Sequence, residues 1–143
     1  MGNGKLWVST RPMEKGSGIC EGQRACIAIV DDDESVRESL PDLLKVLGFT
    51  ARAFLSAEEF LASDCLPETD CLILDVVMRG MNGPQLQTEL KRLGSEVPII
   101  FVTAQSDESL RQHLVEQGAV AYLLKPFSDT ALLEALNQAL RLS

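Results

Sequence analysis

The sequence has 143 residues, of which 45% are hydrophobic and 24% are charged. This length and composition fit one globular domain with a buried core, and they exclude collagen-like, fibrous and disordered chains. Asp and Glu number 21 against 13 Lys and Arg, and the resulting net charge of −8 argues against direct binding of a nucleic-acid backbone.

The charge is divided unevenly along the chain. The first 25 residues contain four basic and two acidic side chains, so residues 26–143 carry a charge of −10. Residues 1–24 combine scattered charges with several glycines and show no hydrophobic period. We therefore expect a flexible N-terminal leader over residues 1–24 and one folded domain over residues 25–143.

The cysteines and the apolar runs indicate the compartment. Cys20, Cys26, Cys65 and Cys71 lack the spacing of a structural zinc site, and the single histidine, His113, is not near them in the sequence. The N-terminus has no apolar stretch typical of a signal peptide, and no apolar run reaches the length of a membrane span. We expect reduced thiols in a cytoplasmic protein without a membrane segment.

From residue 26 onward, short apolar runs alternate with stretches of helical periodicity. In chain order, we expect a strand over 26–30, a helix over 36–47, a strand over 50–54, a helix beginning at residue 56, a strand over 71–74, a helix beginning at residue 84, a strand over 98–102, a helix over 106–117, a strand over 120–124 and a helix over 128–142. This strict alternation predicts an α/β fold with right-handed crossovers and a five-stranded parallel sheet covered by helices on both faces.

Polar side chains stand at the carboxyl ends of four of the expected strands. They are Asp31 with Asp32, Asp75, Thr103 and Lys125. The carboxyl ends of parallel strands meet at one edge of the sheet, where ligands bind in such folds. The topology therefore predicts that three carboxylates, a hydroxyl and an ammonium group converge.

These residue types favour a metal ion and a phosphoryl group. Three clustered carboxylates repel one another, so their joint ionisation at neutral pH requires a cation. Oxygen ligands without His or Cys favour Mg²⁺, which commonly shares its coordination sphere with a phosphoryl oxygen. Lys125 adds a positive charge and Thr103 a hydrogen-bond donor, and both suit a phosphoryl group.

The expected nucleophile is a carboxylate of the chain itself. No glycine-rich loop of the Walker or dinucleotide type follows a strand, so we do not expect a nucleotide to be held here as the phosphoryl donor. An Asp carboxylate can attack phosphorus and form an acyl phosphate. Asp75, alone at the end of a central strand, is the natural candidate.

Residues 25–142 resemble the receiver domain of bacterial two-component response regulators. The resemblance is carried, in the family's order and spacing, by Ile29-Val30-Asp31-Asp32-Asp33, Leu72-Ile73-Leu74-Asp75-Val76-Val77-Met78, Met81-Asn82-Gly83, Ile100-Phe101-Val102-Thr103-Ala104, Gly118-Ala119 and Tyr122-Leu123-Leu124-Lys125-Pro126-Phe127. It implies a flavodoxin-like (CheY-like) fold with strand order 2-1-3-4-5. It also implies phosphorelay signalling, in which a sensor histidine kinase is the partner and the domain is a switch rather than a turnover enzyme.

The resemblance assigns the acidic residues to two roles. Asp75 corresponds to the phosphoacceptor, which takes its phosphoryl group from a phosphohistidine of the kinase. Asp31 and Asp32 correspond to the Mg²⁺-binding pair, and Asp75 and the main-chain carbonyl of Val77 are the further ligands. Asp33 is then a surface acid or a helix cap.

The remaining family positions imply a switch. Lys125 would pair with the acceptor carboxylate and later with the phosphoryl group, and the Lys125-Pro126 bond is cis in this family. Thr103 would hydrogen-bond the phosphoryl oxygen, and Tyr122 would fill the space that Thr103 vacates. A local charge event would thus change the surface formed by the fourth and fifth strands and the helices after them.

One position departs from the family pattern, and another bears on the rate at which the phosphoryl group is lost. Arg79 stands where the usual motif has proline, which leaves a backbone N–H free in the acceptor loop. Val77, two residues after Asp75, lies beside the expected path of an attacking water. Since a valine cannot orient water, we expect a long-lived phosphoryl state.

Two other functions remain open from the sequence. A haloacid-dehalogenase-type aspartyl phosphatase also forms an aspartyl phosphate, but it needs a second Asp where Val77 stands. A degenerate receiver that only binds proteins is disfavoured because all five active-site positions are intact.

The output of the switch is inferred from the family alone. The end of the chain resembles receivers of the FixJ type, which dimerise through the fourth-helix and fifth-strand face and control transcription. We expect the same homodimer when the chain is phosphorylated. Any DNA contact would come from an effector segment outside this sequence.

Overall fold

The structure is a computed structural model, and it describes residues 24–141. The expected leader over residues 1–24 lies outside this range except for Arg24, so its flexibility stays a prediction. In the described range, no helix combines the length and apolar character that crossing a membrane requires.

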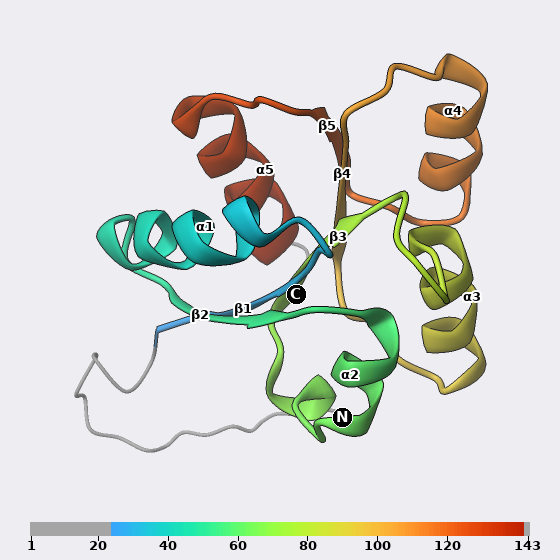
Figure 1. The fold of residues 1–143 in the computed structure, drawn as a ribbon, viewed down its shortest axis with the longest axis horizontal. Helices are drawn as coiled ribbons and strands as arrows, with labels where there is room; N and C mark the ends of the chain where they lie inside the picture. The colour runs from blue at the N-terminus through green and yellow to red at the C-terminus, as the bar shows by residue number, and fades with distance from the viewer. Residues whose placement is uncertain (1–23, 142–143) are drawn as a thin grey trace.

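The centre of the fold is a five-stranded parallel sheet (Figure 1). Its strands are β1 (Cys26–Val30), β2 (Thr50–Phe54), β3 (Cys71–Asp75), β4 (Ile99–Thr103) and β5 (Ala121–Leu124). Their spatial order is β2-β1-β3-β4-β5. The fold class, the parallel sheet and the strand order that the sequence implied are all confirmed.

Five α-helices connect or follow the strands. They are α1 (Glu34–Val46), α2 (Ala57–Ala62), α3 (Gly83–Arg92), α4 (Glu108–Glu116) and α5 (Asp129–Arg141), and a 3₁₀ turn, η2 (Leu66–Glu68), follows α2. Side-chain caps fix several of their starts, because an oxygen at the N-cap accepts a hydrogen bond from a backbone N–H of the first turn. Ser56 is the N-cap of α2 and Asp107 is the N-cap of α4, whose first residue, Glu108, lies two residues after the start that the sequence predicted. The η2 turn was not predicted.

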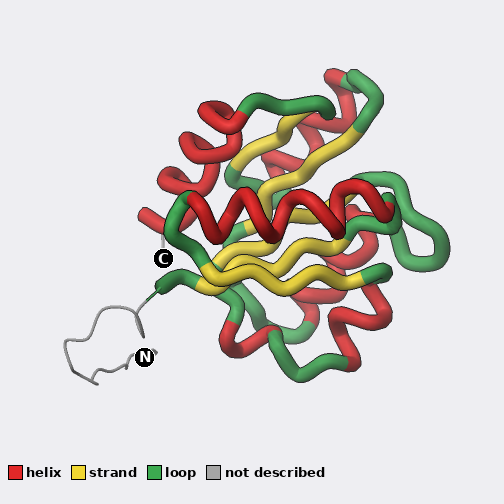
Figure 2. The backbone as a smooth tube through the Cα atoms, turned by 60° about the vertical axis from the view of Figure 1, so that its left-hand side comes forward, coloured by secondary structure: helices red, strands yellow, loops and turns green. Residues whose placement is uncertain are grey.

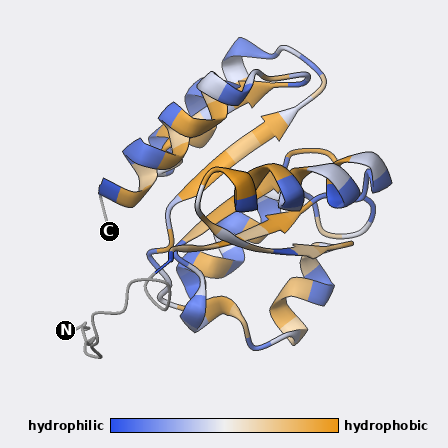
Figure 3. Ribbon diagram, turned by 90° about the vertical axis from the view of Figure 1, so that its left-hand side faces the viewer, coloured by the Kyte–Doolittle hydropathy of each residue, from blue (hydrophilic) through white to orange (hydrophobic). Residues whose placement is uncertain are grey.

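The helices form two layers, with the sheet between them (Figures 1 and 2). Helices α1 and α5 cover one face, and α2, α3 and α4 cover the other. Colouring by hydropathy shows orange strands and helices whose orange sides turn toward the sheet (Figure 3). The strands β3 and β4, which have neighbours on both sides, are buried along their whole length, which explains their continuous apolar sequences.

Alternate strand residues supply two separate cores. Ile73 and Ile100 pack with α1 and α5, whereas Leu74 and Phe101 pack with α2, α3 and α4. The helices contribute Leu44 and Leu136 to the first core and Phe60, Leu86 and Leu114 to the second. The sheet is thereby fixed from both sides, and the residues at its carboxyl edge have a rigid support.

Candidate functional site

Three carboxylates meet at the carboxyl edge of the sheet, as the sequence predicted. Oxygens of Asp31, Asp32 and Asp75 all lie within 4.8 Å of one another. Asp31 is 0% exposed and Asp75 is 6% exposed, whereas Asp32 is partly exposed. Two buried acids and one accessible acid therefore form a cluster that is open toward solvent at Asp32.

The strands and the first helix place these carboxylates. Asp31 directly follows β1, and its N–H donates to the carbonyl of Phe54 (3.2 Å). Asp31 Oδ1 then accepts a hydrogen bond from Asp33 N (2.9 Å), and Asp33 Oδ1 accepts one from Ser35 N (2.9 Å). Asp33 is therefore the N-cap of α1 and not a member of the cluster, which confirms one of its two expected roles.

Asp75 ends β3 and is held from behind by the start of α3. Gly83 packs so closely there that an added Cβ would lie 2.5 Å from the Asp75 carbonyl oxygen and 3.0 Å from Phe101. Gly83 N also donates to the carbonyl of Val76 (3.0 Å). A residue without a side chain is required at this contact, which explains a glycine inside the first turn of a helix.

Lys125 pairs with two of the carboxylates. Its Nζ lies 2.9 Å from Asp31 Oδ2 and 3.6 Å from Asp75 Oδ2. The ammonium is thus closer to Asp31 than to Asp75, the partner that the family resemblance implied. The Lys125-Pro126 bond is cis, as the resemblance implied.

Burial and charge set the protonation of the cluster. Burial, together with the charge of Asp31 and a hydrogen bond with it, raises the pKa of Asp75 to about 7, although Lys125 opposes this shift. Burial alone would lower the pKa of Lys125, but the hydrogen bond and charge of Asp31 and the charge of Asp75 raise it. Lys125 is therefore a fixed cation beside a carboxyl group that titrates near neutral pH.

The cluster fits a divalent metal ion. Apart from its ion pair with Lys125, the buried Asp31 Oδ2 has no hydrogen-bond partner within residues 24–141. A buried carboxylate oxygen left in this way is well suited to bind a cation. The donor set consists of oxygens only, which favours Mg²⁺ over zinc or copper.

The loop after β3, residues 76–82, closes one side of the cluster. The backbone N–H of Arg79 in this loop donates to Asp32 Oδ2 (3.2 Å). A proline at position 79, as in the usual family motif, would have no N–H to make this bond. Val77 is 62% exposed. An apolar side chain therefore stands in solvent two residues after Asp75.

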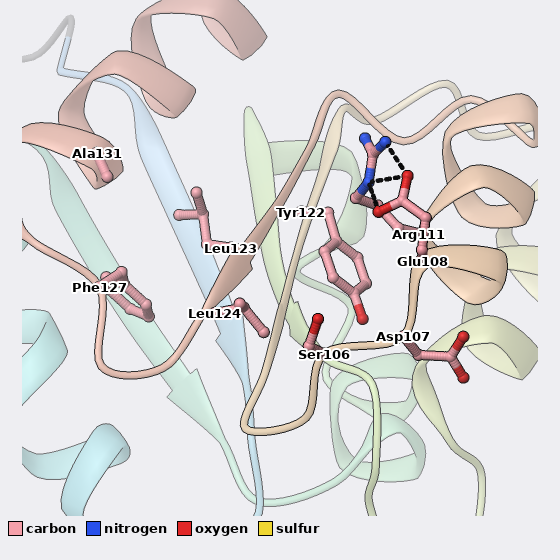
Figure 4. Close-up of a pocket in the computed structure, with 9 residues that line it drawn as sticks. All are labelled: Ser106, Asp107, Glu108, Arg111, Tyr122, Leu123, Leu124, Phe127 and Ala131. Atoms are coloured by element: carbon pink, nitrogen blue, oxygen red, sulfur yellow. Dashed lines mark hydrogen bonds and ion pairs between the residues drawn. The ribbon is translucent and has the colours of Figure 1, made fainter.

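Thr103 and Tyr122 are linked through Gln105. Thr103, 3% exposed at the end of β4, accepts a hydrogen bond from Gln105 N at Oγ1 (3.2 Å). Tyr122, in β5, donates from its hydroxyl to the Gln105 carbonyl (3.4 Å). Its ring is partly buried against the start of α4, in a pocket of about 310 Å³ that Glu108 and Arg111 also line (Figure 4).

Two contacts of the site were not found from the sequence. Glu58, in the first turn of α2, accepts a hydrogen bond from Met81 N in the loop after β3 (2.9 Å). Glu58 was not singled out from the sequence, because a contact across 23 residues leaves no local signal. The bridging role of Gln105 was missed because its backbone, and not its side chain, makes both bonds.

The arrangement supports one kind of chemistry. The Asp75 carboxyl group lies beside the Lys125 ammonium and two further acids, Asp31 and Asp32, at an accessible edge of the sheet. Such a site can stabilise the negative charge that builds up as a phosphoryl group moves to an oxygen nucleophile.

Comparison with known proteins agrees with this chemistry. The sequence model of the response regulator receiver domain matches residues 27–137. The chain is 42% identical over 116 residues to nodulation protein W of Bradyrhizobium diazoefficiens, covering 81% of this chain and 51% of that protein. It is 39% identical over 122 residues to the transcriptional regulatory protein TdiR of Thauera aromatica, covering 85% and 54%.

The chain is also similar to a solved structure. The crystal structure of FixJ-N superposes with a TM-score of 0.74 at 36% identity, and the match covers 83% of this chain and 95% of that one. The chain spans about half the length of the two relatives named above.

Proposed function

The chain belongs to the response regulator receiver domain family, whose members are signalling switches rather than turnover enzymes, and we propose that its switch is phosphorylation of Asp75. The observation that carries the proposal is the position of Asp75. Its carboxylate is the only one in the cluster that ends a central strand, and it lies within 4.8 Å of Asp31 and Asp32 oxygens and 3.6 Å from Lys125 Nζ.

The proposed step is transfer from a phosphohistidine of a sensor histidine kinase. An Asp75 carboxylate oxygen attacks phosphorus and the P–N bond breaks as the P–O bond forms. The imidazole leaves as the neutral base because its other ring nitrogen already carries a proton taken up from solvent. Lys125 stays charged and offsets the added negative charge. Because only the ionised carboxylate is nucleophilic, a cation that lowers the raised pKa of Asp75 would increase the reactive fraction at neutral pH.

We propose that Asp31, Asp32, Asp75 and the Val77 carbonyl hold Mg²⁺. A bound divalent ion neutralises charge on the transferring phosphoryl group and favours the ionised form of the carboxylates. Asp31, whose buried Oδ2 has Lys125 Nζ as its charged neighbour at 2.9 Å, and Asp32, accessible at the rim, support this assignment because their oxygens lie within 4.8 Å of those of Asp75.

The response to phosphorylation is proposed to pass through Thr103 and Tyr122. Thr103 Oγ1 would donate to a phosphoryl oxygen, which changes the bonds around Gln105 that Thr103 and Tyr122 now share. This rearrangement would change the pocket around Tyr122, which lies between α4 and β5 (Figure 4). We propose that this face then pairs with a second copy of the chain, and exposed Leu124 supports it as a contact.

The proposed output is control of transcription in the cytoplasm. The relatives are about twice as long as the match, and TdiR is named as a transcriptional regulator. We propose that a DNA-binding segment outside this sequence makes the contact with DNA, since the acidic domain itself is unsuited to bind a phosphate backbone.

Acetyl phosphate with Mg²⁺ tests the function directly. We expect the wild-type protein to gain one phosphoryl group by intact mass, and Asp75→Asn to gain none. Asp33→Asn is the matched control, because asparagine keeps the N-cap of α1 and Asp33 is outside the cluster. No labelling of the wild type, or equal labelling of Asp75→Asn, would refute the proposal and favour a protein-binding role without phosphorylation.

A further inference from the structure

Glu58 lies outside the acidic cluster but contacts the loop that closes it. Glu58 is exposed in the first turn of α2. Its Oε2 accepts a hydrogen bond from Met81 N, 2.9 Å away, in the loop of residues 76–82. This bond lowers the pKa of Glu58, so the side chain is a carboxylate at neutral pH.

The same carboxylate lies directly against Gly80. A Cβ added to Gly80 would lie 2.9 Å from Glu58 Oε2, and Gly80 has a φ of +73°. The backbone conformation favours glycine at this position, and the absence of a side chain at Gly80 lets the Glu58 carboxylate lie close to the loop.

A second carboxylate, that of Asp32, also binds the backbone of the loop. Arg79 N donates to Asp32 Oδ2 (3.2 Å), so Asp32, between β1 and α1, and Glu58, in α2, bind backbone N–H groups two residues apart in the loop. Asp32 is itself a proposed metal ligand, and an ion would compete with Arg79 for its oxygens. Glu58 is not a member of the acidic cluster, so an ion at Asp32 would not compete directly for the Glu58 oxygen that accepts from Met81 N.

We infer that Glu58 is a positioning residue of the acidic site: through Met81 it fixes the loop that carries the Val77 carbonyl, and it thereby strengthens Mg²⁺ binding. The inference rests on the proposed function, because the Val77 carbonyl is a ligand only there. Hydrogen bonds behind a metal ligand commonly change metal affinity in this way.

The test compares three variants of the full chain. Glu58→Ala removes the bond, Glu58→Gln keeps an oxygen that can accept it, and Glu59→Ala is the matched control. Glu59 is the neighbouring exposed acid of α2, but it accepts its bond from Leu55 N and not from the loop. Amide exchange at Met81 is measured by NMR without Mg²⁺, and the Mg²⁺ dissociation constant is measured by calorimetry.

We expect Glu58→Ala to speed exchange at Met81 and to raise the Mg²⁺ dissociation constant, each by about fivefold, the equivalent of one hydrogen bond. Glu58→Gln and Glu59→Ala should stay near the wild type in both measurements. Equal effects of Glu58→Ala and Glu59→Ala would assign them to the stability of α2 and overturn the inference. Faster exchange with unchanged Mg²⁺ affinity would overturn it as well.

The two proposals fail in different ways. The exchange measurement needs neither metal nor phosphoryl donor, so it reports on the Glu58 bond alone. A wild type that gains no phosphoryl group on Asp75 refutes the proposed function. A wild type that is labelled normally while Glu58→Ala binds Mg²⁺ equally well refutes only the role of Glu58.

Discussion

The ammonium of Lys125 lies nearer to Asp31 than to Asp75, at 2.9 Å against 3.6 Å. In the unphosphorylated protein, the lysine therefore balances the most deeply buried acid of the site. A phosphoryl group on Asp75 would add negative charge on the side where the ammonium makes its weaker contact. In this geometry, the Lys125 ammonium can move toward Asp75 and still remain close to Asp31.

The first prediction concerns this ion pair. Lys125→Met removes the cation and leaves Asp31 buried and uncompensated, so the free energy of unfolding in Mg²⁺-free buffer should fall by about 2 kcal/mol. Added Mg²⁺ should restore much of the loss, because it supplies the missing positive charge. Urea denaturation with and without Mg²⁺ measures both effects. A loss that Mg²⁺ leaves unchanged would show that the packing of the lysine stem, and not its charge, is responsible.

The second prediction follows from the pKa of Asp75. Its value of about 7 in the folded protein exceeds the ordinary value of 3.8, so the folded state holds the proton more tightly than the unfolded chain. This contribution to stability is complete below about pH 4 and is lost as the pH rises toward 7. Asp75→Asn has no such loss, so without Mg²⁺ it should exceed the wild type in stability by at least about 1 kcal/mol at pH 8.

Thermal unfolding from pH 5 to pH 8 in chelator measures this difference. The gap between Asp75→Asn and the wild type should widen with pH, whereas Asp33→Asn should follow the wild type. A gap that narrows as the pH rises would contradict the raised pKa.

The third prediction concerns Gly83. Alanine there would place a Cβ 2.5 Å from the Asp75 carbonyl oxygen, and the backbone cannot yield without moving the end of β3 or the start of α3. We expect a loss of about 2 kcal/mol in the free energy of unfolding and weaker Mg²⁺ binding. Gln85→Ala, in the same first turn of α3, loses part of its capping box and is the control for helix stability alone.

The fourth prediction concerns the lifetime of the phosphoryl group. Val77 is exposed beside the acceptor and cannot hydrogen-bond water, so decay of the phosphorylated protein should be slow. Val77→Asn supplies a polar group, and we expect the decay rate to rise roughly tenfold, less than a full general base provides. Loss of the mass-labelled species over time measures it. An unchanged rate would show that water reaches the phosphorus by a path that avoids residue 77.

Much of the fold could be predicted because a buried strand has a continuous run of apolar residues. The runs at β3 and β4 are continuous and apolar, and both strands proved to be buried along their length. Thr103 and Lys125 were placed at the carboxyl edge by topology alone. The start of α4 was predicted too early because Ser106 and Asp107 are both residue types that can cap a helix, and the cap bond, from Leu110 N, goes to Asp107.

The sequence predicted which residues form the site better than it predicted the contacts between them. The sequence brought Asp31, Asp32 and Asp75 together, but it could not tell which of them Lys125 approaches more closely. That preference depends on fractions of an ångström in side-chain position. The Glu58 bond to Met81 was hidden for another reason, since it joins an exposed side chain to a backbone N–H and leaves no trace in hydrophobic pattern or motif spacing.

The division of the interior into two cores has a consequence for how the molecule can change. The acidic cluster is built mainly from strand ends, while each helical layer packs on its own set of strand residues, such as Ile100 on one face and Phe101 on the other. Substitutions that remodel one layer leave the side chains of the other layer in place. Recognition surfaces on the helices can therefore diversify independently of each other while the same chemistry is retained at the rim of the sheet.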